Sequence, residues 1–227
     1  LALKLFKLDN ELKIENSDIL EELPKIANRL TLTANRFKII GNIPYYITGK
    51  LLRTISELKN KPEITILMIQ KEVAERICAK PPKNNLLAAA TQIWAEPEIL
   101  FSLSPEDFEP QPEVNSAVIK LESRSENLEL GIMENYYKLI HIIFKQPRKT
   151  LLNNLNDGLD ISRAELEQIL DNQKIDRKSR PQDLSIEQIK ELSLVLYLFG
   201  GSTSCRRLNL PTFPFTLLPL TKLRVYN

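Results

Sequence analysis

The stretch FKIIGNIPYYITGKLLRTISEL, residues 37–58, joins an apolar run, a proline-containing loop and a helical pattern in direct succession. Phe37–Gly41 is a short apolar run of the kind that forms a buried strand. Lys50–Leu58 carries leucines and an isoleucine at helical spacing. The loop Asn42–Tyr45 would therefore lie at the carboxyl end of a strand, which is where ligands bind in open α/β sheets.

The residue types of this loop suit methylation of an amine on a planar base. The lone pair of such an amine is delocalised into the ring, and acceptors for its two hydrogens favour a pyramidal, reactive nitrogen. The Asn42 side chain and the backbone carbonyl of Ile43 are candidate acceptors, and Pro44 stiffens the loop that aims that carbonyl. Tyr45 offers a ring on which a flipped base stacks. For an isolated motif, a tight turn with an aromatic side chain packed beneath it is the alternative.

Other segments extend the strand and helix alternation of an α/β fold. Leu12–Glu15 and Ile64–Gln70 are predicted strands, and Ile19–Leu30 and Val73–Cys78 are predicted helices. Further along, three apolar runs separated by prolines predict a hairpin that closes the sheet edge: Ala88–Ala95, Ile99–Leu103 and Ala117–Leu121.

A second, all-α domain is predicted over residues 131–199, after a linker that follows a first domain over residues 1–124. Two capping boxes, Ser162 with Glu165 and Ser185 with Gln188, predict helix starts. Residues 200–227 contain three prolines and no acid, and are expected to be a disordered tail, more readily a read-through or frameshift product than an RNA-binding appendage. One apolar helical face is predicted for Tyr136, Leu139, Ile140, Ile143 and Phe144.

The composition indicates a soluble globular protein, with 43% hydrophobic and 26% charged residues. No apolar run approaches the roughly eighteen residues of a membrane span, and no segment resembles a signal peptide. A cytoplasmic protein without a membrane partner is therefore expected. Cys78 and Cys205 lack the paired spacing of a zinc site or a disulfide framework, so no metal site is predicted.

The net charge of +2 is unevenly distributed. Four of the 31 basic residues lie in residues 200–227, so the rest of the chain holds 27 basic against 29 acidic residues. Any nucleic-acid surface must therefore be a local basic patch.

Four blocks of the chain resemble the bacterial 16S ribosomal RNA adenine dimethyltransferases. Gly41–Ile47 is similar to the signature of that family, and Gln70–Val73 with Arg76 is similar to its next block. Phe108–Val118 resembles its proline-rich block. A weaker likeness extends from about residue 9 to residue 199. The fourth block, a basic helical segment, contains Phe144, Gln146, Arg148, Lys149 and Asn153.

This resemblance implies a fold and a reaction. The fold is a Rossmann-like class I methyltransferase sheet followed by a small all-α domain. The reaction transfers methyl groups from S-adenosyl-L-methionine to the 6-amino groups of two adjacent adenosines in small-subunit (16S) rRNA, during ribosome biogenesis. The implied partner is the 30S particle or its rRNA, and a monomer is expected.

The resemblance also implies roles for single residues. Asp18 would accept a hydrogen bond from the adenine of the cofactor, although an Asp before Ile19–Leu30 also suits a helix cap. Asn42 would contact both cofactor and substrate, and Phe108 would stack on the target base opposite Tyr45. His141 is expected to be structural.

Five basic side chains are candidate phosphate contacts, although each one taken singly is more readily a solvated surface charge: Lys71, Arg76, Lys145, Arg148 and Lys149.

The sequence departs from the family pattern in three places. No glycine precedes Gly41, so the glycine-rich turn that brings a backbone close to the cofactor is absent from this sequence. Leu1 aligns just beyond the ribose-binding acid, so the first strands are expected to be missing and the fragment is expected to bind the cofactor weakly and to be inactive. Pro147 replaces a usual Arg, and residues 84–92 contain less glycine than expected.

Two other functions remain open from sequence alone. The scaffold could serve without catalysis, as a ribosome assembly or RNA-binding factor, although a pure binder has no need of an amine-polarising Asn42. The chemistry could instead act on large-subunit rRNA, as in the antibiotic-resistance methylases. The block Phe108–Val118 and the helical segment after residue 131 favour the small-subunit enzyme.

Overall fold

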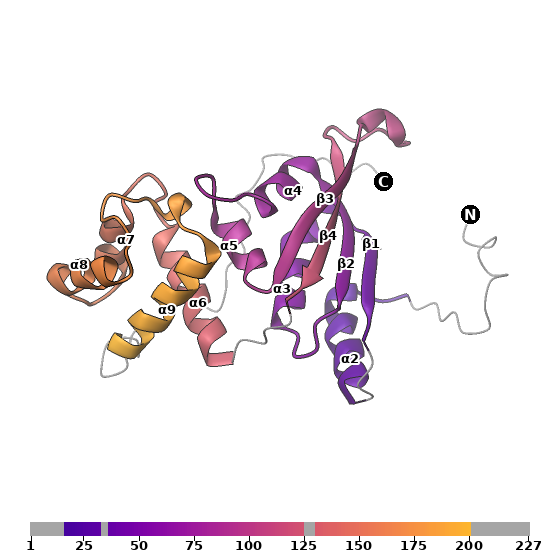
Figure 1. Cartoon of the computed structure of the whole chain (residues 1–227). Helices are drawn as coiled ribbons and strands as arrows, with labels where there is room; N and C mark the ends of the chain where they lie inside the picture. Colours follow the sequence, from indigo (N-terminus) through magenta and orange to yellow (C-terminus); the bar gives the residue numbers. More distant parts are fainter. Residues whose placement is uncertain (1–15, 33–35, 125–129, 201–227) are drawn as a thin grey trace.

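The computed structural model describes residues 16–32, 36–124 and 130–200 (Figure 1). A four-stranded sheet is formed by β1 (Lys38–Asn42), β2 (Ile64–Gln70), β3 (Ala95–Leu103) and β4 (Ser116–Ser123), in the order β1-β2-β4-β3. β1 and β2 are parallel, whereas β4 is antiparallel to both of its neighbours. The predicted strands of residues 37–41 and 64–70 are confirmed within one residue, and Leu12–Glu15 lies outside the described residues.

Eight α-helices occupy the described residues. Four alternate with the strands: α2 (Ile19–Leu32), α3 (Thr48–Glu57), α4 (Lys71–Ile77) and α5 (Leu86–Gln92). The other four follow the sheet: α6 (Leu130–Ile143), α7 (Leu151–Gly158), α8 (Arg163–Asn172) and α9 (Ile186–Gly200). Figure 1 shows α6–α9 gathered on the far side of α5 from the sheet. This mixed α/β architecture, with a helical part after the sheet, confirms the fold class expected from the sequence. None of the described helices is long and apolar enough to cross a membrane.

The two predicted capping boxes are present. The Ser162 hydroxyl and the Glu165 carboxylate exchange hydrogen bonds with each other's backbone N–H, and α8 begins directly after Ser162. Ser185 and Gln188 make the same reciprocal pair at the start of α9. Each pair satisfies backbone donors that a helix start leaves without an intrahelical partner.

The prediction that Ala88–Ala95 forms part of a hairpin is wrong, because most of this run belongs to helix α5. The Asn85 side chain accepts hydrogen bonds from the backbone N–H groups of Leu87 and Ala88, at 3.0 and 3.1 Å, and so caps the helix. The strand β3 begins only at Ala95. The hairpin itself is formed by β3 and β4.

The two faces of the sheet differ in exposure. Thr65, Leu67 and Ile69 of β2 are buried on the face covered by helices, whereas the residues between them are only half-buried. On that second face Ile40 of β1 is 81% exposed and Phe101 of β3 is 53% exposed. Within the described residues β1 is also an edge strand, with β2 as its one neighbour.

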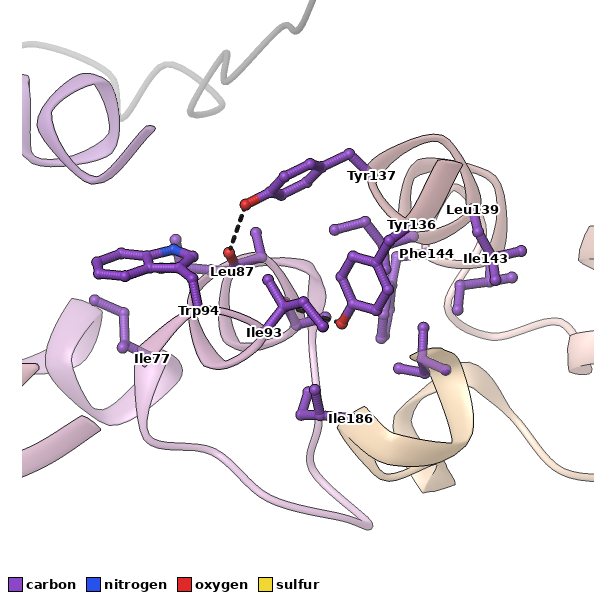
Figure 2. Close-up of a cluster of buried hydrophobic side chains, with 14 of the residues drawn as sticks. Ile77, Leu87, Ile93, Trp94, Tyr136, Tyr137, Leu139, Ile143, Phe144 and Ile186 are labelled. Carbon is purple, nitrogen blue, oxygen red and sulfur yellow. Dashed lines mark hydrogen bonds between the residues drawn. The ribbon is translucent and has the colours of Figure 1, made fainter. Parts of the chain in front are cut away.

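Two tyrosines of α6 attach the helical part to α5. The Tyr136 hydroxyl donates to the Ala89 carbonyl at 3.0 Å, and the Tyr137 hydroxyl donates to the Ala90 carbonyl at 3.2 Å. Both carbonyls belong to the last turn of α5, where helix carbonyls lack intrahelical donors. Figure 2 shows the two rings between α5 and α6, edge to face at 6.0 Å between centroids. Burial raises the pKa of Tyr137 to about 12, and raises that of Tyr136 as well.

A second link runs through Asn84, which is buried. Its side-chain amide donates to the carbonyl of Leu184 at 3.0 Å, and its backbone N–H donates to the carbonyl of Gln182.

The predicted apolar face of α6 is confirmed, because all five of its residues are buried: Tyr136, Leu139, Ile140, Ile143 and Phe144.

We expect Gly158→Ala to lower the free energy of unfolding by about 1–3 kcal/mol, as overpacking of a core commonly does. A Cβ at Gly158 would lie 2.4 Å from Cγ2 of the buried Ile142, so the α6–α7 contact would have to shift. The control is Gly131→Ala, where an added Cβ meets no atom within 4 Å. Urea unfolding should show that variant unchanged, or stabilised by up to about 1 kcal/mol. Equal effects of the two substitutions would contradict the tight packing at Gly158.

Candidate active site

The loop after β1 makes a backbone hydrogen bond within itself. The N–H of Ile47 donates to the carbonyl of Pro44 at 3.1 Å, and a short 3-10 turn, η1 (Tyr45–Ile47), leads directly into α3. Gly41 allows the close approach on which this loop depends. A Cβ there would lie 3.2 Å from side-chain atoms of both Ile43 and Leu67. An added Cβ would therefore require the side chains of Ile43 and Leu67 to give way by a few tenths of an ångström.

A cavity of about 330 Å³ opens above the ends of β1 and β2. This volume falls at the lower end of the range typical of small-molecule sites, which is roughly 300–1,000 Å³. The walls are largely apolar, and the cavity contains all five residues predicted to take part in catalysis. It is lined by Asn42, Ile43, Pro44, Tyr45, Met68, Phe108, Pro110 and Pro112.

Asn42 supplies the polar group of this cavity. It is the last residue of β1 and pairs in register with Met68 on β2. It is exposed, and its side chain makes no hydrogen bond to any other described residue. An amide with both its oxygen and its nitrogen available, at the edge of an apolar cavity, is suited to bind a polar group of a ligand.

Tyr45 lines the cavity from the β1 loop, and Phe108 reaches it from the β3–β4 connection. The Ser104–Asp107 pair holds this connection in shape, because the Asp107 carboxylate accepts from the backbone N–H of Ser104 at 2.8 Å. A neighbouring hollow, also lined by Phe108, carries Glu106, Asp107 and Glu109. That side of the site is therefore acidic and would repel a phosphate backbone.

Sequence reasoning missed one contact of the site. The Tyr45 hydroxyl lies 2.6 Å from the Ser116 hydroxyl, which belongs to the first residue of β4. The two residues are 71 positions apart, and Ser116 is fully buried. The signal available in the sequence was only that Ser116 lies within the proline-rich block.

Asp18 precedes α2, and its carboxylate accepts from the backbone N–H of Leu20 at 2.9 Å. The predicted capping role is therefore confirmed. Among the described residues only this one hydrogen bond reaches the Asp18 side chain, so the second carboxylate oxygen is available. Figure 1 shows α2 running opposite to β1, which directs the start of α2 toward the end of the sheet where Asn42 lies. Asp18 thus keeps one acceptor, and its contact with a cofactor stays a prediction.

The candidate phosphate contacts fall into two groups. Lys71 and Arg76 lie on α4, directly after β2. The exposed residues Lys145, Arg148 and Lys149 lie on the connection between α6 and α7, on the other side of α5 (Figure 1). Whether both groups contact one RNA remains a prediction.

The connection between α6 and α7 is shaped by Asn154, a buried residue that sequence reasoning did not identify. Its amide donates to the carbonyls of Gln146 and Thr150, at 3.0 and 3.2 Å. Lys149 is engaged by Asp157 of α7, with 2.9 Å between Nζ and the carboxylate. The basic side chains of this segment are therefore carried by a loop whose backbone is held by hydrogen bonds from Asn154.

His141 lies apart from the cavity, on α6, where it is half-buried. Burial lowers its pKa, and the nearby positive charge of Arg53 lowers it further, which favours the neutral ring. No group of three or more His, Cys, Asp or Glu side chains suited to a metal ion occurs within residues 16–32, 36–124 and 130–200.

Comparison with known proteins decides the family. The model of the ribosomal RNA adenine dimethylase family matches residues 1–196 of the 227. The chain belongs to this family. Among curated relatives of this dimethylase, the ribosomal RNA small subunit methyltransferase A of Dehalococcoides mccartyi (strain CBDB1) is 35% identical over 190 residues, which cover 83% of the chain. That of Caldanaerobacter subterraneus subsp. tengcongensis is 38% identical over 200 residues, which cover 86% of the chain.

The dimethylase chain spans 64% of the length of the Dehalococcoides relative and 72% of the Caldanaerobacter one. Two solved structures share its fold. A dimethyladenosine transferase from Plasmodium falciparum has a TM-score of 0.68 at 18% identity, covering 88% of this chain and 77% of the other. The 23S rRNA methyltransferase ErmE has a TM-score of 0.56 at 22% identity, covering 76% of this chain and 77% of the other. The expected Rossmann-like methyltransferase fold is thereby confirmed.

Proposed function

We propose that this chain carries the target-base pocket of an enzyme that dimethylates the 6-amino groups of two adjacent adenosines in small-subunit rRNA. The observation that carries the proposal is the cavity above β1 and β2. It joins one free amide, that of Asn42, to two aromatic side chains, Tyr45 and Phe108, from separate parts of the chain. This combination suits a flipped base, which needs stacking surfaces for its ring and hydrogen-bond partners for its edge.

Each part of the cavity has a distinct task in this proposal. Asn42 and the backbone carbonyl of Ile43 accept the two amine hydrogens and favour a nitrogen whose lone pair points outward. Pro44 and η1 hold that carbonyl in place, since a displaced acceptor loses most of its effect. Tyr45 and Phe108 bind the ring between them. No strong general base is needed, because the methylated amine becomes acidic enough to release its proton to water.

The methyl donor proposed is S-adenosyl-L-methionine, which supplies an activated methyl group on a sulfonium when it is bound. The described residues fit such a group in two places. The free carboxylate oxygen of Asp18 can accept from the amine of the cofactor's adenine, and Asn42 can contact cofactor and substrate together.

The small ribosomal subunit is the proposed substrate in preference to the large one. The curated relatives at 35% and 38% identity are named small-subunit enzymes, whereas ErmE, named for 23S rRNA, shares only 22% of its sequence and therefore supports the fold alone. A purely structural RNA-binding role is less well supported, because the free amide of Asn42 in the cavity serves chemistry better than binding.

The proposal can be tested in a fusion that adds the N-terminal part of the Dehalococcoides relative ahead of Leu1. The fusion supplies the glycine-rich turn that the sequence before Gly41 lacks. Small-subunit particles without the modification are incubated with radiolabelled S-adenosyl-L-methionine, and the nucleosides are analysed by mass spectrometry. We expect N6,N6-dimethyladenosine at two adjacent positions. Methylation of large-subunit rRNA instead, or of neither RNA, would overturn the proposal.

We expect the double substitution Arg148→Ala and Lys149→Ala to make the negative slope of log affinity against log salt shallower by about 1.5, with a loss of affinity for all RNA sequences alike. The reason is that binding releases fewer counterions from the RNA when fewer phosphates are contacted. To contact a phosphate, Lys149 must first leave Asp157. Filter binding to small-subunit RNA at several salt concentrations measures the slope.

The matched control for this prediction is Arg36→Ala with Lys59→Ala. These exposed residues precede β1 and β2, at the end of the sheet opposite to the cavity, and removing them changes the net charge equally. If both double variants change the slope by the same amount, the basic loop before α7 has no special part in binding RNA.

A further inference from the structure

The hydrogen bond between Tyr45 and Ser116 joins two parts of the site that differ in rigidity. Ser116 is fully buried at the start of β4, paired in register with Gln70 of β2. The carbonyl of the preceding residue, Asn115, accepts from the backbone N–H of Lys71 at 2.9 Å. The Ser116 hydroxyl is therefore fixed at the junction of β2, β4 and α4.

Tyr45 is less constrained. It is half-buried and begins the 3-10 turn η1, on a loop that no strand pairs with among the described residues. Its ring lines the cavity, and its hydroxyl reaches Ser116 at 2.6 Å. A Tyr side chain has two rotatable torsions. The hydroxyl oxygen lies on the axis of the second torsion, so a hydrogen bond there fixes the first torsion and with it the position and direction of the ring axis. The bond is made at the edge of the ring and therefore does not itself cover either ring face.

We infer that Ser116 is a positioning residue, which holds the ring of Tyr45 at the place in the cavity needed to stack on the target base. The inference rests on the proposed function, and adds to it a residue outside the β1 loop. Stacking depends on the distance between two planes and on their tilt, so a ring that swings away about its first torsion loses contact even though its chemistry is unchanged.

The inference predicts that Ser116→Ala and Tyr45→Phe have the same effect, because each removes one partner of the same bond. The net contribution of such a bond corresponds to about a fivefold change in an equilibrium constant. Combining the two substitutions should add no further loss, since the bond is already absent in either single variant. A residue with an independent structural role would give an additive loss.

The test uses the full chain and an RNA hairpin in which one of two adjacent loop adenines is replaced by 2-aminopurine, whose fluorescence is quenched when it stacks. We expect the ratio of quenched to unquenched probe to fall about fivefold in Ser116→Ala, in Tyr45→Phe and in the double variant alike. RNA affinity, measured by anisotropy, should change little, because phosphate contacts dominate it.

The matched control is Ser123→Ala, at the other end of β4, where the hydroxyl donates to the carbonyl of Pro62. It should leave the quenching unchanged.

A second measurement separates this inference from the proposed function. In the chain without RNA, NMR of labelled tyrosine rings should show one fixed environment for Tyr45, and an averaged one in Ser116→Ala. An unchanged ring signal in Ser116→Ala, or additive losses of quenching, would overturn the positioning role. Absence of quenching by the unsubstituted chain, with RNA bound and the ring fixed, would instead overturn the proposed pocket for the base.

Discussion

Replacing Asn42 by alanine should reduce methyl transfer on the order of 100-fold or more, while RNA affinity stays close to that of the unsubstituted enzyme. The magnitude follows from other sites in which one aimed hydrogen-bonding group at the reacting atoms was removed. Among the described residues that line the cavity, Asn42 is the one with an amide or carboxylate oxygen in its side chain. Its effect is concentrated in the transition state, because only there does the amine become pyramidal.

The measurement is the rate of methyl incorporation by the fusion described above, at saturating concentrations of small-subunit particles. A loss confined to the maximal rate, with an unchanged half-saturating concentration, would identify a transition-state interaction. The control is Asn28→Ala, an exposed asparagine on α2 that is remote from the cavity walls. If Asn42→Ala retains most of the rate, the acceptor role assigned to Asn42 is incorrect.

The largest effect on stability is expected at Tyr136. Tyr136→Ala should lower the free energy of unfolding by about 3–5 kcal/mol, the range found when a large buried ring is removed. The ring is fully buried between α5 and α6, contacts Tyr137 edge to face and donates to the last turn of α5. Removing it leaves a cavity and an unsatisfied carbonyl at Ala89. Tyr136→Phe, which keeps the ring, should cost about 1–2 kcal/mol.

Urea unfolding followed by circular dichroism checks this expectation. Tyr46→Ala is the matched control, because the same side chain is removed from a residue that is 78% exposed. It should change stability by less than about 0.5 kcal/mol, as surface substitutions usually do. A cost at Tyr136 no larger than at Tyr46 would show that α5 and α6 are not held together through this ring.

The sequence predicted the parts of this fold whose signals are local. β2 has a clean apolar run, and the starts of α8 and α9 are marked by complete capping boxes. The run Ala88–Ala95 was misassigned because a short apolar segment has no periodicity that separates a strand from a buried helix. The cap at Asn85 was the available local signal.

The residues of the candidate site also fall into those that local sequence indicates and those that only the fold brings together. Asn42 and Tyr45 could be found from sequence because one loop at a strand end contains both, and Phe108 required the resemblance to a family. Ser116 and Asn154 could not be found, since their roles come from contacts that only the folded chain creates. Ser116 contacts Tyr45, which is 71 positions away in the sequence. The amide of Asn154 donates hydrogen bonds to backbone carbonyls of the loop between α6 and α7.

Among the described residues, β1 has no neighbouring strand on the side away from β2. A strand edge left open in this way, beside the largely exposed Ile40, is the arrangement through which sheets of separate molecules join. Lys38, at the start of the same strand, is the kind of charge that opposes such joining. Any strand that pairs with β1 along its whole length ends next to Asn42. A segment that covers this edge would therefore also border the pocket proposed for the target base.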